Sequence, residues 1–172
     1  SSVPEALELA LDALDENREP NLRILVAKNL AAAYLDLGQV SRARSQYQAV
    51  PEPGEPILAT HYRWLGARLL RAEGRPNWAA TAFREVLKEL EEQGSPIALA
   101  ACRLELAATL VEIDCREEAL CVAADALPQM LQTQRYALQS EVLLLQALTR
   151  SAENLSPGPL DQLASHLRKI GA

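Results

Sequence analysis

Four side chains that could bind an acidic ligand recur at helical spacing near the middle of the chain. His61, Trp64, Arg68 and Arg71 are three or four residues apart, so a helix would place them along one face. Arginine binds carboxylates through two parallel hydrogen bonds, and a neighbouring indole adds apolar area or a cation–π contact. This pattern favours a face that binds an acidic peptide or a small anionic effector.

The charge around these residues is opposite to that of the whole chain. Residues 61–84 hold five arginines against one glutamate, a local charge of +4. The 172 residues together carry 17 Lys and Arg and 23 Asp and Glu, a net charge of −6. The acidic total argues against general nucleic-acid binding, which needs a surplus of cations. Two interpretations of the arginines stay open: they bind an acidic partner, or they lie over the surface and pair with carboxylates of adjacent helices.

Residues for catalysis or metal binding are sparse. The two histidines, His61 and His166, are far apart in sequence, and Cys115 and Cys121 do not have zinc-ligand spacing. The chain has no glycine-rich phosphate loop, nucleophile elbow or H-E-x-x-H motif. We therefore expect no enzymatic activity, no cofactor and no metal. All three cysteines, with Cys102 as the third, are interpreted as small core residues of a reduced protein.

The elements that position these residues are expected to be helices. Hydrophobic residues make up 49% of the chain and aromatic residues only 4%, which argues against a β-sandwich. Ala and Leu dominate the apolar set, and both are strong helix formers. No stretch approaches the ~18 uncharged apolar residues of a membrane span, so we expect a soluble, cytoplasmic protein. The chain starts without Met, and we interpret it as a fragment of a longer protein.

An internal repeat is centred on three turn residues, Gly38, Gly74 and Asp114, which are 36 and 40 residues apart. Small and large residues recur at helical offsets on both sides of each turn. Each repeat is therefore predicted to be two antiparallel helices in close contact, and a residue with left-handed backbone angles ends the first helix. In the third repeat Asp114 is also predicted to cap the start of the second helix, together with Glu117. Before each turn the recurring residues are Ala31, Ala67 and Ala107 at seven positions, and Tyr34, Leu70 and Leu110 at four. After each turn they are Ala43, Ala79 and Ala119 at five positions, Tyr47, Phe83 and Ala123 at nine, and Val50, Val86 and Ala126 at twelve.

Proline and glycine divide the chain between the pairs. Residues 51–56 and 94–96 are rich in both, as expected where one helix ends and the next begins. At the amino end, Ala6 corresponds to Ala43 at a spacing of 37 and marks the second helix of an incomplete pair. The sequence predicts a single all-α domain of about nine helices. Its parts are a half-unit over 1–18, units over 21–52, 56–93 and 96–131, and a terminal helix pair over 134–171.

Three segments carry a resemblance to a known family. They are Ala31-x-x-Tyr34-x-x-x-Gly38, Ala67-x-x-Leu70-x-x-x-Gly74 and the stretch from Asp114 to Leu120. This pattern resembles the tetratricopeptide repeat (TPR) family, whose unit is a helix–turn–helix of about 34 residues. It is similar to the divergent repeats of bacterial signalling proteins and large ATP-binding transcription activators. The resemblance implies a right-handed α-solenoid whose hollow side, lined mainly by first helices, binds peptides or partner helices.

The resemblance also implies a function and the residues that perform it. The function is that of a protein–protein interaction scaffold holding a segment of a partner protein, acidic in view of the arginines, with no role for nucleic acid or membrane. Two alternatives stay open. One is an effector-binding sensor segment of a bacterial transcription regulator or signalling ATPase, and the other is self-assembly into a homo-oligomer through apolar end faces. The implied groove residues are Lys28, Asn29, His61, Trp64, Arg68, Arg71, Leu104 and Ala108.

Two arginines stand where the family carries a buried tryptophan. Arg63 and Arg103 are 40 residues apart at this position, and Ala27 takes it in the first unit. Two unpaired buried charges would be very costly. We therefore expect both arginines to pair with nearby carboxylates, unless the first helices are rotated, which would shift the groove residues by about one position.

Overall fold

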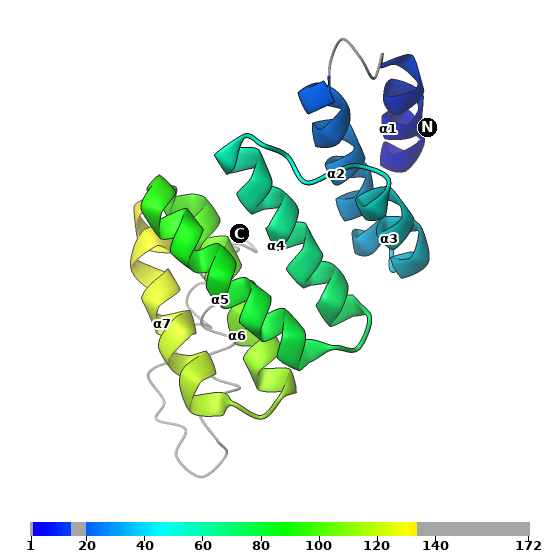
Figure 1. The fold of residues 1–172 in the computed structure, drawn as a ribbon. Coiled ribbons are helices and arrows are strands. Elements are labelled where there is room, and N and C mark those ends of the chain that lie inside the picture. The colour runs from blue at the N-terminus through cyan, green and yellow to red at the C-terminus, as the bar shows by residue number, and fades with distance from the viewer. Residues whose placement is uncertain (1, 15–19, 134–172) are drawn as a thin grey trace, which may run out of the picture. The chain divides into compact units, whose positions relative to one another are not determined.

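The computed structural model describes residues 2–14 and 20–133, and in this part of the chain all regular structure is helical (Figure 1). The all-α class is therefore confirmed. The terminal helix pair expected over 134–171 lies outside the described residues. The seven helices described are α1 (Val3–Ala13), α2 (Pro20–Asp36), α3 (Val40–Gln48), α4 (Pro56–Ala72), α5 (Pro76–Gln93), α6 (Pro96–Glu112) and α7 (Arg116–Thr133).

Proline opens the first helix of each predicted pair. α2, α4 and α6 all begin at a proline and all contain 17 residues. A first-turn N–H has no partner inside the helix, so proline loses nothing at this position. At α4 the preceding Glu55 completes the start, because its carboxylate accepts hydrogen bonds from the N–H groups of Ile57 and Leu58 at 3.1 and 2.7 Å. These local signals fix where the site-bearing helix begins.

The three predicted turns share one hydrogen-bond pattern. Gly38, Gly74 and Asp114 have φ values of 71°, 73° and 60°, in the left-handed region. The residue after each turn donates its N–H to the carbonyl five positions earlier, at 2.8, 3.0 and 2.9 Å. The turn residue itself donates to the carbonyl three positions earlier, at 2.9, 3.0 and 3.2 Å. This is the Schellman arrangement that ends a helix, so the prediction for the turn residues is confirmed.

Asp114 does not cap α7. Its Oδ1 accepts a hydrogen bond from Nε of Arg116 at 2.7 Å, and the carbonyl of Cys115 accepts from the N–H of Ala119 at 3.0 Å. Cys115 therefore occupies the cap position, and the predicted capping box of Asp114 with Glu117 is wrong. A residue that ends one helix has left-handed φ and ψ, whereas an N-cap is extended, so one residue cannot fill both roles.

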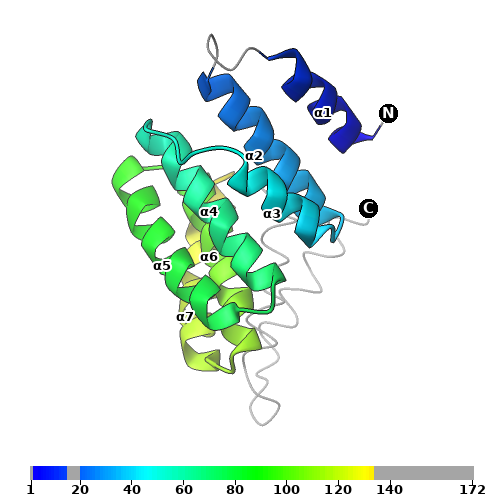
Figure 2. The ribbon, with the colours of Figure 1, turned by 45° about the vertical axis from the view of Figure 1, so that its right-hand side comes forward.

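The chain divides into two compact units, Ser1–Trp78 and Ala79–Ala172. In the first unit α2 packs against α1, α3 and α4, and α3 also packs against α4. Both views show α1, α2 and α3 side by side (Figures 1 and 2). The core of this unit has two clusters of buried residues. They are Leu30, Ala31, Tyr34, Ala43, Leu65 and Leu69, and Ile24, Ala27, Val50 and Tyr62.

A tyrosine pair closes the short helix α3, which has nine residues where α5 and α7 have 18 each. The Tyr62 hydroxyl donates to the carbonyls of Tyr47 and Val50, at 2.9 and 3.2 Å, just where α3 ends. The two tyrosine rings are stacked, with centroids 4.2 Å apart and planes at 15°. Gly66 of α4 faces this pair so closely that an added Cβ would lie 2.6 Å from Tyr47 Oη. The close contact explains a glycine in the middle of a helix.

In the second unit α6 packs against α7 through small side chains. Ala100, Leu104 and Ala107 of α6 form a buried cluster with Ala123 and Ala126 of α7. Across both units, the predicted contact positions seven before and five after each turn are at most 1% exposed. Small residues at these positions let helices approach closely, which confirms this part of the repeat prediction.

Candidate interaction face on α2 and α4

The predicted anion-binding residues of α4 share one side of that helix. His61, Trp64, Arg68 and Arg71 are all half-buried, whereas Leu65 between them is buried in the core. The spacing of three and four residues therefore places them at the rim of the core, where part of each side chain remains accessible. All four belong to the first unit.

An aromatic stack joins two of these residues to a cation on α2. His61 and Trp64 are stacked with ring centroids 5.8 Å apart and planes at 22°. Burial lowers the pKa of His61, the positive charge of Lys28 lowers it further, and Glu55 opposes the shift. His61 is therefore neutral at pH 7. We refer to Lys28, His61 and Trp64 as the Lys28 cluster.

Lys28 carries the positive charge of this cluster. It is half-buried on α2, and burial lowers the pKa of its ammonium group. Within the described part of the chain no carboxylate forms an ion pair with it. The neighbouring Asn29 is exposed on the same helix and adds a polar amide beside the cluster. Together these residues offer one desolvated cation, one amide and an aromatic surface.

Arg68 is paired within the unit. Its Nη2 lies 2.7 Å from Oδ1 of Asp36, so the ion pair links α4 to the end of α2. Its charge is thus balanced by a carboxylate that the sequence analysis did not single out. Asp36 ends α2, the first helix of the preceding pair, two residues before the Gly38 turn, and this position is the signal that could have identified it. Arg71 lies in the last turn of α4, where a cation interacts favourably with the helix dipole.

Two other arginines of the basic segment have acidic partners, and a third lies over an aromatic ring. Arg63 pairs with Glu52, and Arg84 binds Glu118 through Nε and Nη2 at 2.9 and 2.8 Å. Arg75 lies over the ring of Trp78, 5.6 Å from its centroid. For Arg63, Arg68 and Arg84 the second interpretation of the sequence is therefore confirmed: they pair with carboxylates of other segments.

The arginines at the family's tryptophan position are paired as expected. Arg63 pairs with Glu52, as described above. Arg103 Nη2 lies 3.1 Å from Oε1 of Glu91, and its Nη1 donates to the carbonyl of Asp125 at 3.2 Å. Pairing, the first of the two alternatives, is confirmed for both residues.

The two predicted groove residues of α6 differ from each other in how far they are buried. Leu104 is buried in the cluster between α6 and α7, at 5% exposure, and Ala108 is half-buried. Little of the Leu104 side chain is therefore accessible to a partner, and the groove role of both residues stays a prediction. α6 has apolar residues on almost every side, so the spacing of its apolar residues did not indicate which side of the helix faces the core.

The cysteines divide into two kinds. Cys102 is fully buried, and burial raises the pKa of its thiol, so its interpretation as a core residue is confirmed. Cys115 and Cys121 are exposed, and for these two the interpretation is wrong. Cys115 is exposed because it caps α7, where the helix begins at the surface.

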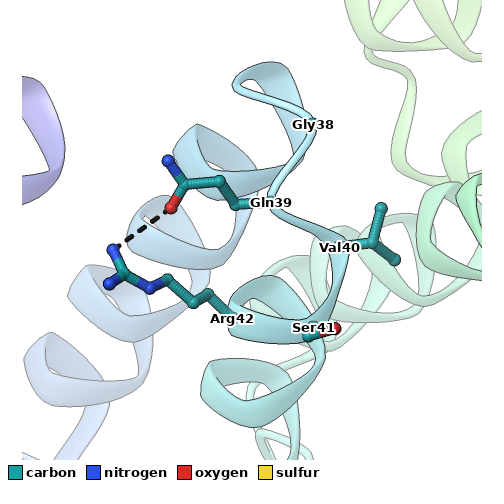
Figure 3. Close-up of a pocket in the computed structure, with 5 residues that line it drawn as sticks. All are labelled: Gly38, Gln39, Val40, Ser41 and Arg42. Atoms are coloured by element: carbon teal, nitrogen blue, oxygen red, sulfur yellow. Dashed lines mark hydrogen bonds between the residues drawn. The ribbon is translucent and has the colours of Figure 1, made fainter.

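A separate pocket of about 470 Å³ lies at the turn between α2 and α3 (Figure 3). Its described lining is Gly38 to Arg42. Arg42 Nη1 donates to Gln39 Oε1 at 3.2 Å, and the Val40 side chain points away from this pair. None of the predicted site residues lines it.

Within residues 2–14 and 20–133, no group of three or more His, Cys, Asp or Glu is arranged to hold a metal. Over the same residues, every helix is too short or too polar to span a bilayer.

Comparison with known proteins gives a structural neighbour and no family. No family model matches the chain, and no curated protein matches it significantly. The crystal structure of BtubC (BKLC) from P. vanneervenii is similar, with a TM-score of 0.58 and 16% sequence identity. The similarity covers 99% of this chain and 85% of that one. At this identity the likeness concerns the fold alone.

Proposed function

We propose that this chain is an interaction domain that binds an acidic segment of a partner protein at the Lys28 cluster. The observation that carries the proposal is the half-buried ammonium of Lys28, which the described part of the chain leaves without a carboxylate. Next to it, the stacked His61 and Trp64 offer a flat apolar surface. A carboxylate from a partner would supply the missing countercharge, and the chain around it would cover the indole.

Energetic considerations favour this cluster over the arginines. A partly desolvated cation without a countercharge is destabilising, and an incoming carboxylate removes that cost. Arg68 already has Asp36 as a partner at 2.7 Å, so a ligand would have to compete for it. We therefore assign ligand contact to Lys28, Asn29 and Trp64, and assign to Arg68 the role of holding α4 against α2.

We further propose that the helix pairs stack as a TPR-like α-solenoid in a cytoplasmic protein. The support is local: three turns with the same hydrogen bonds, three first helices of equal length, and alanines buried at equivalent positions. Repeats of this kind bury their apolar faces only against neighbouring repeats. The free thiols of all three cysteines fit a reducing compartment.

The test is affinity capture from native lysate with tagged wild type, Lys28→Glu and Trp64→Ala side by side. A charge-assisted hydrogen bond contributes about 1.5–3 kcal/mol, so Lys28→Glu should reduce capture of the partner about tenfold or more. Lys88→Glu makes the same change of charge at an exposed position of α5, which contributes no residue to the cluster, and serves as the matched control. Equal capture by wild type and Lys28→Glu would refute the proposal.

A small anionic effector, as in a sensor segment, would use the same charge. It would raise the melting temperature of wild type and not of Lys28→Glu, since a ligand stabilises only the folded state that binds it. Such a shift, with no protein captured at the cluster, would favour the sensor function over the scaffold.

A further inference from the structure

Helix α1 has an apolar side that no described element covers. Leu7 and Leu11 pack towards the core that α2 helps to form. On the other side Val3 and Leu9 are 68% and 69% exposed. Five exposed residues fall within a stripe of roughly 120° around the helix axis. This outer stripe consists of Val3, Ala6, Leu9, Ala10 and Ala13.

The repeat indicates what normally covers this surface. At a spacing of 37, Ala6 corresponds to Ala43 and Ala13 to Val50, both on or just after α3. Ala43 is 0% exposed and Val50 is 8% exposed, and each belongs to a buried cluster with residues of α2. In the second unit Ala126 of α7, which corresponds to Val50, belongs to a buried cluster with residues of α6. The outer stripe of α1 is thus the surface that the first helix of a pair covers elsewhere in the chain.

The charges of α1 indicate the chemistry of a partner. The helix carries Glu5, Glu8 and Asp12 and no basic residue. Glu5 forms a capping box with Ser2, and Glu8 accepts a hydrogen bond from Tyr34, whereas Asp12 is exposed beside the stripe. Two copies of α1 would bring like charges together, which is unfavourable. A helix with basic residues beside its apolar face would pair favourably with α1.

We propose that the outer stripe of α1 docks a basic amphipathic helix of a partner protein, with a small residue against Ala6 and Ala10 and a large residue three positions further on. This spacing is that of Ala31 and Tyr34 in α2, the helix that covers Ala43. The inference does not depend on the Lys28 cluster.

A peptide with the sequence of residues 56–72 is a suitable probe. It carries Ala67 and Leu70 at the required spacing, three arginines and no acidic residue. The matched control is the same peptide with its three arginines replaced by glutamate. Each labelled peptide is titrated with the full chain, and binding is followed by fluorescence anisotropy. We expect wild type to bind the basic peptide at least tenfold more tightly than the acidic one.

Two variants test the stripe and the charge separately. Ala10→Arg places a long cation on the stripe and should weaken binding of the basic peptide at least tenfold. Asp12→Lys leaves the stripe unchanged and should weaken the basic peptide while strengthening the acidic one. Both positions are exposed, so folding should be preserved, which circular dichroism checks. Gln48→Arg, exposed on α3, adds a cation elsewhere and should bind like wild type.

Several outcomes would overturn the inference. These are absence of binding at millimolar peptide, equal binding of the two peptides, and unchanged binding by Ala10→Arg and Asp12→Lys. A dimer of the wild type that Ala10→Arg dissociates in sedimentation would instead assign the stripe to a second copy of the chain.

Discussion

Replacing Gly66 by alanine should destabilise the first unit, although alanine is the better helix former. Alanine in a helix interior is favoured over glycine by about 1 kcal/mol. Here the new Cβ would lie 2.6 Å from Tyr47 Oη and 3.2 Å from Tyr47 Cζ. The ring cannot easily move aside because it is stacked on Tyr62. Overpacking of this kind costs about 1–3 kcal/mol, so the expected net loss is ~0–2 kcal/mol.

Tyr47→Phe removes the atom that causes the clash. In this background the shortest contact becomes the one at 3.2 Å, which small shifts can relieve, so Gly66→Ala should stabilise the protein by up to about 1 kcal/mol. The change of sign is the specific expectation. Loss of the Tyr47 hydroxyl has its own cost, but this cost is common to the two proteins that carry Tyr47→Phe and cancels in a double-mutant cycle.

The assay is urea unfolding of the four proteins, followed by the tryptophan fluorescence of Trp64 and Trp78 in the first unit. The cycle should give a coupling energy of about 1–3 kcal/mol between positions 47 and 66. Additive effects, with Gly66→Ala stabilising by the same amount in both backgrounds, would show that the close approach of α3 and α4 does not exist.

Two further stability effects follow from named groups. Asp114→Gly should raise the melting temperature, because glycine adopts the left-handed φ of 60° without the steric cost of about 1 kcal/mol that other residues have. Arg44 binds both carboxylate oxygens of Glu73, at 2.6 and 2.5 Å, and this hydrogen bonding lowers the pKa of Glu73 below its ordinary value of 4.5. The stability that the pair contributes, ~1 kcal/mol or less, is therefore present above pH 4.5 and is lost as the pH falls through the lower folded-state value. Acid titration of stability in Glu73→Gln should lack this loss, and an unchanged acid profile would contradict the assignment.

The repeat was predictable because its residues act locally. A left-handed turn residue, a small residue seven positions before it and an alanine five after it each have a steric role that depends on a few neighbouring positions. Substitution of glycine by Asp114 did not hide the third turn, since aspartate tolerates the left-handed region better than most residues. Helices α2, α4 and α6 accordingly end two residues before Gly38, Gly74 and Asp114.

The partners of the arginines were less predictable because they lie outside the helical period. Asp36 is 32 residues from Arg68, and Glu118 is 34 residues from Arg84. Within residues 61–84 these arginines form an excess of positive charge because their carboxylates lie in other segments of the chain. The pairing of neighbouring helices likewise shows that no carboxylate of the described residues forms an ion pair with Lys28.

The loop after α3 has a further consequence for how this region can change. Val50 and Pro53 are buried although neither lies in a helix, and Tyr62 holds the carbonyl of Val50. Connecting segments ordinarily accept insertions and substitutions freely because they are solvated. Here the irregular residues 49–55 contribute two buried side chains to the interior of the first unit. In related sequences, the length and the residue types of this connection should therefore be as restricted as those of a helix.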